Sequence, residues 1–434
     1  MSAMTEKACF KPTRVLLPKE RPECFSVVAC DQYTSQPAYW EEVKRLTEGV
    51  PSSYHIILPE VYLPEGEEAT ARRIESIGRT MREYLDGDVF TAVDNAMILV
   101  ERTLADGRIR YGLLGAIDLE QYDYHADAGS FIRATEETVL SRIPPRVRIR
   151  EGAVLDMPHL MLLADDRENR LFAPLVEKKA SLPCLYDFDL MQESGHLRGY
   201  LLSASDIGHV TEIFAEFSDP AFFRSRYRST AHPLVFAVGD GNHSLAAAKE
   251  CYEAVKKELG AEKAASHPAR YALAELVNIH DPALDFEPIY RLLTGAELDD
   301  LLQYLRQAEP KFHGGASRPG ELSLYFQSEL ERRTLCIPAE HGVLPVQVLQ
   351  PLLDGFLAEH PDVGIDYIHG LDTVRELAKE PGNIAITFRG MEKTQLFSAI
   401  VHGGVLPRKT FSMGHACDKR FYLECRSLVP TEKQ

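Results

Sequence analysis

Residues 235–249 read Val235-Phe-Ala-Val-Gly-Asp-Gly-Asn-His-Ser-Leu-Ala-Ala-Ala-Lys249, and three kinds of segment follow one another in them. The first residues are continuous and apolar, as in a strand that is buried on both faces. Gly239-Asp-Gly241 interrupts this run with glycines, which tolerate positive φ and close backbone approach. From Ser244 onward the residues have high helix propensity. The pattern predicts a strand at 234–239, a turn, and a helix at 244–259.

The first turn of this helix is a candidate anion site, because its N–H groups lack intrahelical partners and face the positive end of the helix dipole. Asn242, His243 and Ser244 flank that turn and can donate hydrogen bonds to a phosphate or carboxylate. Alternatively, Asp240, Asn242 and Ser244 are only turn and cap residues, and His243 is a histidine satisfied by its neighbours. On the residues alone the two interpretations carry equal weight.

Hydrophobic periodicity predicts a mixed α/β protein of more than one domain around this segment. A buried strand at 270–279 would complete a βαβ-like unit. We expect helices at 37–48, 67–86 and 204–217, strands at 26–30 and 54–63, and hairpins spanning 96–119 and 184–202. After residue 295 we expect helices at 296–308, 346–360 and 371–380, and paired strands at 321–327 with 332–338 and at 383–389 with 394–401. The predicted division is 1–125 (N-terminal α/β region), 126–294 (central domain) and 295–434 (C-terminal α+β module).

Composition excludes some classes of function. The chain has 434 residues and a formal net charge of −17, which opposes binding to nucleic acid. Eight scattered cysteines without a Cys-x-x-Cys pair indicate reduced thiols, and no apolar run is long enough for a membrane span. The N-terminus has no signal-peptide pattern, so we expect a cytoplasmic protein. No metal site is predicted, because His402, His415 and Cys417 complete no four-ligand zinc pattern.

Two other charged groups are candidates for chemistry. Arg146, Arg148 and Arg150 would share one face of a strand if Val147 and Ile149 faced a core. Such a row could bind an anion, although a solvated face paired with acids is the more common explanation. Glu136 and Asp31 are candidate general bases, and a turn-capping role for Asp31 is at least as well supported.

The segment Asp240-Gly-Asn-His-Ser244 resembles the Asp-Gly-His-His-Arg signature of a family known as domain of unknown function 1015. Further blocks that resemble this family are Cys30-Asp-Gln-Tyr33 with Tyr39-Trp40, Ile132-Arg-Ala-Thr-Glu-Glu-Thr138 followed by Arg142, Asp285-Phe-Glu-Pro-Ile-Tyr-Arg291, and Pro407-Arg-Lys-Thr410. The resemblance covers residues from about 25 to 428. The family's activity is not established.

The signature turn is remotely similar to the phosphate turn of a superfamily that includes ParB-type proteins, sulfiredoxin and an archaeal free-serine kinase. The similarity implies a central ParB/sulfiredoxin-like domain with a mixed sheet. It also implies phosphate contacts from Gly241, Asn242, His243 and Ser244. Ser244 stands where the signature has arginine, and this loss should weaken phosphate binding by about 1.5–3 kcal/mol. Lys249 and Arg291 are candidate replacement cations, and Arg142 in the matched block is a further candidate ligand.

Two functions are consistent with this pattern. The first is a nucleotide-dependent phosphotransferase, similar to a small-molecule kinase, that uses ATP or ADP with Mg²⁺ on a small polar metabolite. In it Glu136, Asp31, Asp240 and His243 are the catalytic candidates. The alternative is a non-catalytic regulatory protein that binds a nucleotide or anion, which the loss of the signature arginine favours. The sequence does not indicate an oligomeric state.

Overall fold

The computed structural model describes residues 9–125, 129–138, 143–157 and 159–430. Contacts divide the chain into two compact units. The larger unit comprises the described residues of Met1–Ala134, Thr138–Leu284 and Gly414–Gln434, and the smaller unit comprises Thr135–Glu137 and Asp285–Met413. The three-part division of the sequence stays a prediction.

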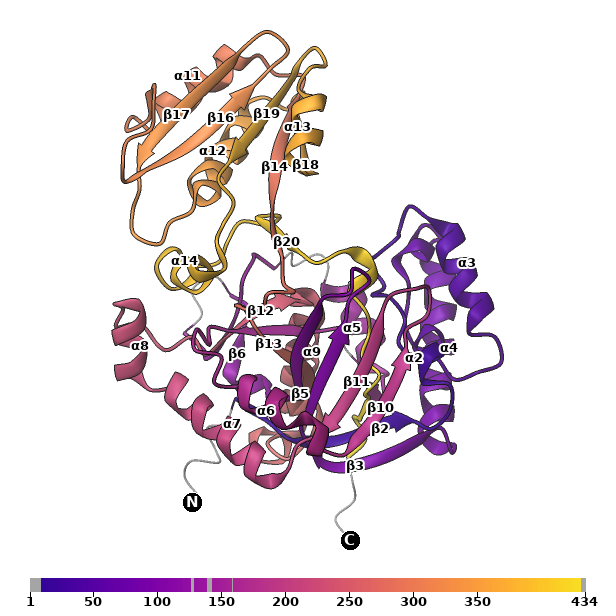
Figure 1. Cartoon of the computed structure of the whole chain (residues 1–434). Helices are drawn as coiled ribbons and strands as arrows, with labels where there is room; N and C mark the ends of the chain where they lie inside the picture. The colour runs from indigo at the N-terminus through magenta and orange to yellow at the C-terminus, as the bar shows by residue number, and fades with distance from the viewer. Residues whose placement is uncertain (1–8, 126–128, 139–142, 158, 431–434) are drawn as a thin grey trace. The chain divides into compact units, whose positions relative to one another are not determined.

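A ten-stranded mixed sheet forms the centre of the larger unit (Figure 1). Its strand order is β10-β11-β4-β5-β13-β9-β12-β7-β6, and β1 pairs with β5 beside this path. The strands are β1 (Phe10–Lys11), β4 (Ile98–Thr103), β5 (Ile109–Asp118), β6 (Tyr122–Asp123), β7 (Ile132–Ala134), β9 (Met161–Ala164), β10 (Cys184–Asp189), β11 (His196–Leu201), β12 (Phe236–Asp240) and β13 (Tyr271–Asn278). Two further ribbons pair β2 (Thr13–Pro18) with β3 (Phe90–Ala96) and β8 (Leu155–Asp156) with β21 (Arg426–Ser427).

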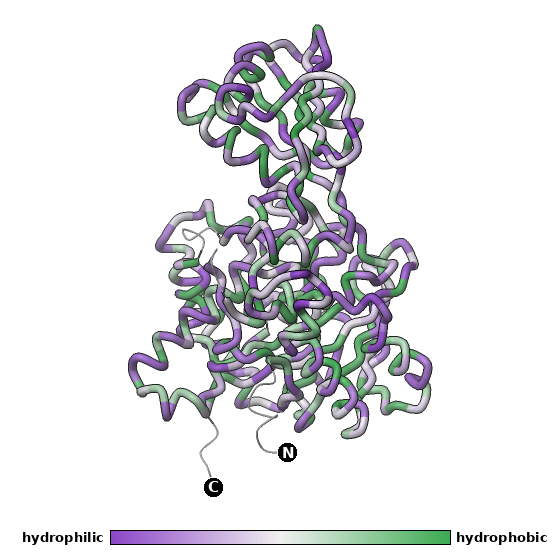
Figure 2. The backbone as a smooth tube through the Cα atoms, turned by 90° about the vertical axis from the view of Figure 1, so that its left-hand side faces the viewer, coloured by the Kyte–Doolittle hydropathy of each residue, from purple (hydrophilic) through white to green (hydrophobic). Residues whose placement is uncertain are grey.

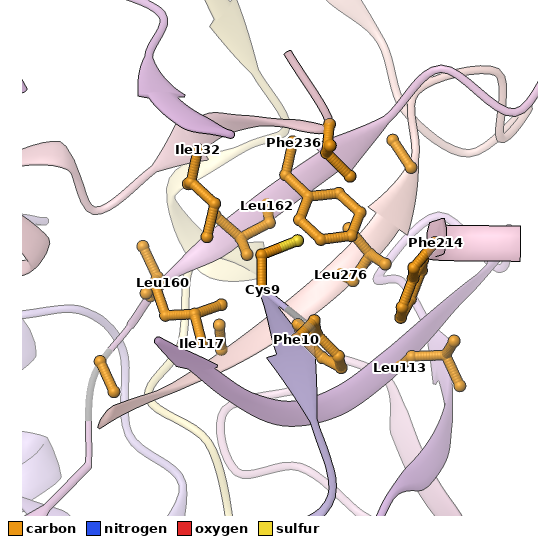
Figure 3. Close-up of a cluster of buried hydrophobic side chains, with 14 of the residues drawn as sticks. Cys9, Phe10, Leu113, Ile117, Ile132, Leu160, Leu162, Phe214, Phe236 and Leu276 are labelled. Atoms are coloured by element: carbon orange, nitrogen blue, oxygen red, sulfur yellow. The ribbon is translucent and has the colours of Figure 1, made fainter. Parts of the chain in front are cut away.

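Helices cover both faces of this sheet, because its strands bury alternate side chains in two separate cores. On β4, Leu99 belongs to one core and Val100 to the other. Phe10, Phe214 and Phe236 form an edge-to-face cluster in the first core, with ring centroids 5.1–6.1 Å apart (Figure 3). The helices of this unit are α2 (Pro22–Phe25), α3 (Pro37–Leu46), α4 (Glu67–Asp86), α5 (Ile143–Glu151), α6 (Ala173–Lys178), α7 (Ala204–Phe217), α8 (Pro220–Tyr227), α9 (Asn242–Leu259) and α10 (Ala261–Ala264).

The central strand–turn–helix is confirmed as β12 followed by α9, but the βαβ-like arrangement is wrong. β9 lies between β12 and β13, antiparallel to β12 and parallel to β13. The two strands that flank α9 therefore run in opposite directions. Hydrophobic periodicity identifies β12 and β13 one at a time. It does not reveal that β9 lies between them in the sheet.

Three other expectations about local structure are wrong. Residues 26–30 form a single bridge, between Val28 and Arg420, instead of a strand. Residues 54–63 form two 3-10 helices, Ser53–Ile56 and Glu60–Glu65, because Ser52 caps the first and Pro59 precedes the second. Residues 394–401 lie in the helix α14 (Leu396–Gly403) and the 3-10 turn before it.

The arginine row is also wrong as a strand face, since these residues lie on α5. Pro144 and Pro145 favour the first turn of a helix, and this local signal outweighs the alternation that follows it. The three guanidinium groups pair with carboxylates of the same unit: Arg146 with Glu60, Arg148 with Glu67, and Arg150 with the buried Asp156. The ion-paired explanation is therefore the one observed.

The smaller unit has an antiparallel sheet in the order β15-β17-β16-β19-β14-β18, with β20 also paired to β14. Its strands are β14 (Phe286–Thr294), β15 (His313–Gly314), β16 (Glu321–Gln327), β17 (Arg332–Pro338), β18 (Gly364–His369), β19 (Asn383–Phe388) and β20 (Phe411–Met413). Its helices are α11 (Leu298–Ala308), α12 (Pro345–Glu359), α13 (Leu371–Leu377) and α14. The α+β character expected after residue 295 is confirmed.

Hydrophobic and hydrophilic stretches alternate along the backbone of the larger unit (Figure 2). Among the described residues, no helix combines the length and hydropathy needed to cross a bilayer.

Candidate functional site

The turn between β12 and α9 is held against the backbone before β9. Gly241 has a φ of +83°, and a Cβ built on it would lie 2.3 Å from the carbonyl oxygen of His159. A side chain at this position is therefore excluded by both conformation and space. The contact brings His159 to the first turn of α9.

α9 begins without a side-chain cap among the described residues, whereas two other helices of the same unit are capped. Ser203 forms a capping box with Asp206 at the start of α7, and Asp219 caps α8. α9 is 18 residues long, so the positive end of its dipole is well developed at this turn. An uncapped start of this kind suits an anionic ligand.

Asp240 forms the centre of a charged cluster beside the turn. Its Oδ2 lies 3.1 Å from His159 Nε2 and 3.3 Å from Lys419 Nζ, and its Oδ1 accepts a hydrogen bond from the Gly241 amide at 2.8 Å. Burial favours the neutral acid, but the charges of Lys419 and His159 and these hydrogen bonds outweigh it and hold the pKa of Asp240 well below its ordinary value. Asp240 is among the catalytic candidates that the sequence predicts, yet a carboxylate stabilised as an anion in this way is a poor proton acceptor.

Both ring nitrogens of His159 face hydrogen-bond acceptors, which favours a proton on each. Its Nδ1 lies 2.7 Å from the Arg420 carbonyl oxygen and its Nε2 faces the Asp240 carboxylate, and both of these partners can only accept hydrogen bonds. Burial disfavours the charged ring, but the Asp240 charge and hydrogen bond prevail and raise the pKa of His159. These contacts favour the imidazolium form of His159, which would place two cationic groups, His159 and Lys419, around one carboxylate.

The sequence predicted that Asn242, His243 and Ser244 flank the start of a helix, and α9 does begin at Asn242. All three residues are half-buried. The Oδ1 of Asn242 is buried and has no hydrogen-bond partner within the described part of the chain. Exchanging the oxygen and nitrogen of this amide would present two donors in the same place. Asn242 thus has unused hydrogen-bonding capacity next to the uncapped turn.

The structure also brings Asp31 into the neighbourhood of this cluster. The bridge between Val28 and Arg420 places the segment before Asp31 alongside the segment that contains Lys419. The negative charge of Asp31 contributes to the raised pKa of His159, so its carboxylate is within electrostatic reach of the cluster. Asp31 is exposed and accepts a hydrogen bond from Gln32 at 2.9 Å.

Lys249, one of the candidate cations predicted from the sequence, makes contacts within the larger unit. The Nζ of Lys249 donates to the Leu119 carbonyl oxygen at 2.9 Å and pairs with Glu253 at 2.9 Å. Arg142 lies outside the described residues. The ammonium of Lys249 is therefore already bound by groups of the protein along the side of α9. These contacts explain the presence of a lysine at this position without a bound ligand.

Glu136 and Arg291 belong to the smaller unit and help to organise it. Arg291 is completely buried, and its guanidinium donates to the side chain of Gln350 and to the carbonyl oxygens of Ile289 and Lys409. Burial lowers the pKa of Arg291 to about 10, so it remains charged at neutral pH. Glu136 accepts hydrogen bonds from the amides of Lys409 and Thr410, both at 3.3 Å. These contacts give both residues a structural role that the matched sequence blocks did not reveal.

Sequence reasoning missed His159 and Lys419, which lie 81 and 179 residues from Asp240. Their signals in the sequence were a histidine two residues before the apolar strand β9 and a lysine within the C-terminal segment. Neither signal is specific, because the pairing depends on the antiparallel register of β9 and β12. No group of three metal-ligating side chains occurs among the residues that the structure describes.

Comparison with solved structures gives distant similarities. A mutant free serine kinase in complex with ADP shares 10% identity at a TM-score of 0.38, over 69% of this chain and 87% of that chain. A conserved hypothetical protein from Pyrococcus furiosus shares 11% identity at 0.35, over 69% and 90%. SbnI with a C-terminal truncation from Staphylococcus aureus shares 9% identity at 0.34, over 69% and 82%.

No curated protein matches the chain. A family model does match, over residues 10–355, and its description is "Protein of unknown function (DUF1015)". The match covers most of the chain, which therefore belongs to the DUF1015 family.

Proposed function

We propose that this protein is a nucleotide-dependent phosphotransferase that acts on a small polar metabolite and holds the nucleotide phosphate at the start of α9. The observation that carries the proposal is the uncapped first turn of α9, where the Gly241 backbone packs against His159. Backbone amides and the helix dipole together favour a phosphate in such a place. Asn242, His243 and Ser244 would add side-chain donors.

Lys419 would supply the positive charge that the family signature places at position 244, where this chain has serine. Its ammonium lies 3.3 Å from Asp240, and its side chain is 24% exposed, so it can reach a ligand beside the turn. His159 keeps the negative charge of Asp240 neutralised, which reduces its repulsion of a phosphate.

Asp31 is the preferred general base. It is exposed and close to the cluster, whereas both oxygens of Glu136 already accept backbone hydrogen bonds. In phosphoryl transfer the base orients the acceptor hydroxyl and takes its proton, while positioning and charge stabilisation provide most of the acceleration.

ATP or ADP with Mg²⁺ is the proposed cofactor. Mg²⁺ would be held mainly by the nucleotide phosphates and by water, because the carboxylate of Asp240 is already paired with His159 and Lys419. The ion neutralises the phosphate oxygens when it is bound.

The test is to measure ATP and ADP binding by calorimetry and phosphate transfer from labelled ATP or ADP to a panel of hydroxylated metabolites. A labelled product that depends on Asp31 supports the proposal. Nucleotide binding without any product would favour the second candidate, a regulatory nucleotide-binding protein, which Ser244 in place of arginine also favours. Absence of nucleotide binding would contradict both.

A further inference from the structure

A cavity of about 40 Å³ lies within the larger unit, and His159 is one of its lining residues. Ionisable side chains from four separate segments line it, among them Arg102, Arg110, Glu275, Asp418 and Glu424. The cavity is large enough for a few water molecules or for one ion of similar size. Its walls are far more charged than is usual for the interior of a protein.

Two arginines face this cavity side by side. Arg102 on β4 is the direct cross-strand partner of Arg110 on β5, and the two residues are 3% and 7% exposed. Like charges directly opposite each other destabilise a sheet. Glu275 on the next strand accepts hydrogen bonds from Arg110, whose Nη2 lies 2.9 Å from the carboxylate.

Arg102 has a weaker partner, because it forms an ion pair without a hydrogen bond. Its nearest carboxylate oxygen is Asp418 Oδ1 at 3.9 Å, which is beyond hydrogen-bond distance. Both Nη1 and Nη2 of Arg102 are buried without a hydrogen-bond partner in the described residues, and the same holds for Asp418 Oδ1. Arg420, the third arginine in the cavity wall, is satisfied by the Ser26 carbonyl oxygen and by Ser194.

The guanidinium of Arg102 remains charged. Burial and the neighbouring arginines lower the pKa of Arg102 to about 9, which still leaves it protonated at neutral pH. Buried N–H groups of a charged side chain are unfavourable without hydrogen-bond acceptors, and proteins normally supply an acceptor or an ion beside them. Nη1 and Nη2 of Arg102 lack such acceptors among the described residues, and Asp418 at 3.9 Å supplies charge without a hydrogen bond.

We propose that this cavity binds one small monovalent anion, such as formate, nitrate or chloride, against the guanidinium of Arg102. A planar oxyanion fits the fork of the guanidinium best, because it can accept two parallel hydrogen bonds. The site is separate from the proposed phosphate site at α9, so either proposal can fail without the other.

The experiment is a thermal melt of the full-length protein in which sodium gluconate, too large for the cavity, is replaced stepwise by sodium formate, nitrate or chloride at constant ionic strength. The melting temperature should rise by about 2 °C or more and then reach a plateau, as expected for a ligand that binds only the folded state. Arg102→Met should abolish this response. Arg102→Met leaves the buried Asp418 without its ion-pair partner, so circular dichroism must first show that this variant is folded.

Arg108→Met is the matched control, because Arg108 lies at the tip of the same hairpin and pairs with the partly exposed Asp106. It should keep the wild-type response to anions. No response of the wild-type protein to any of the three anions, or an equal response in Arg102→Met, would overturn the proposal. If Arg102→Met does not fold, bromide soaked into crystals of the wild-type protein decides: an anomalous peak at Arg102 supports the site and its absence overturns it.

Discussion

The carbonyl oxygen of His159 occupies the space that a Cβ of residue 241 would need, at a distance of 2.3 Å. The side chain of the same histidine binds Asp240, the residue before that glycine. One residue at the edge of β9 therefore fixes both the backbone and the charge of the turn that begins α9. The backbone conformation of Gly241 and the negative charge of Asp240 therefore both depend on His159.

The first prediction concerns the close approach at Gly241. Gly241→Ala should destabilise the larger unit by about 1–2 kcal/mol for the left-handed φ, and by about 1–3 kcal/mol more for the overlap with His159. Gly107→Ala in the β4–β5 turn is the control, because its φ is +85° and no atom lies within 4 Å of the added Cβ. Urea denaturation of both variants measures the difference, and equal losses would show that the contact with His159 does not constrain the turn.

The second prediction follows from the raised pKa of His159. The stabilisation from its charged form is fully present below the unfolded pKa of about 6.5 and is lost as the pH rises through the higher folded pKa. His159→Gln should therefore lose more stability relative to wild type at pH 6 than at pH 9. A difference between the two proteins that is constant over this range would mean that the ring is neutral in the folded state.

The third prediction concerns Glu424, whose pKa is raised to about 7 by burial and by the charge of Glu275, against the hydrogen bond from Tyr186. The folded state holds this proton more tightly than the unfolded state, so stability should fall as the pH rises from about 4.5 to 7. The shift corresponds to about 3 kcal/mol. In Glu424→Gln this part of the pH dependence should be absent. Urea denaturation from pH 4.5 to 8 checks the difference, and parallel curves for the two proteins would rule out the raised pKa.

The fourth prediction separates binding from catalysis. Asp31→Asn should retain nucleotide affinity and reduce phosphate transfer by about 10²–10⁴-fold, the usual contribution of a general base. Asp94→Asn is a suitable control, because Asp94 lies on β3 and pairs with Arg14 at the surface. Unchanged transfer in Asp31→Asn would remove this residue from the mechanism and leave the phosphate site untouched.

Local sequence signals were sufficient for much of the fold. α4 and α7 have the predicted bounds, because their caps and apolar faces lie within a few residues of one another. The predicted hairpin around Asp106-Gly107 is present as β4 and β5, since the turn itself determines the pairing. The motif was also placed correctly, at the junction of β12 and α9.

The remaining features depend on long-range register. The position of β9 between β12 and β13, and hence the pairing of His159 with Asp240, cannot be derived from the periodicity of any one segment. The burial of Arg291 was hidden for the same reason, since a strand residue next to aromatic neighbours gives no sign of its hydrogen-bond partners. Matched sequence blocks identified the family, and they did not distinguish structural arginines from ligand-binding ones.

The central claim is that the first turn of α9 holds phosphate, and amide NMR tests it most directly. ADP with Mg²⁺ should shift the backbone amide resonances of Asn242, His243 and Ser244 in the wild-type protein, with saturation at the concentration that calorimetry gives for binding. Those of Ser203 and Ser205 at the start of α7, where Ser203 caps the helix, should remain unchanged. Saturable ADP binding that leaves the three α9 amides unshifted, or no binding of ADP at all, would contradict the account.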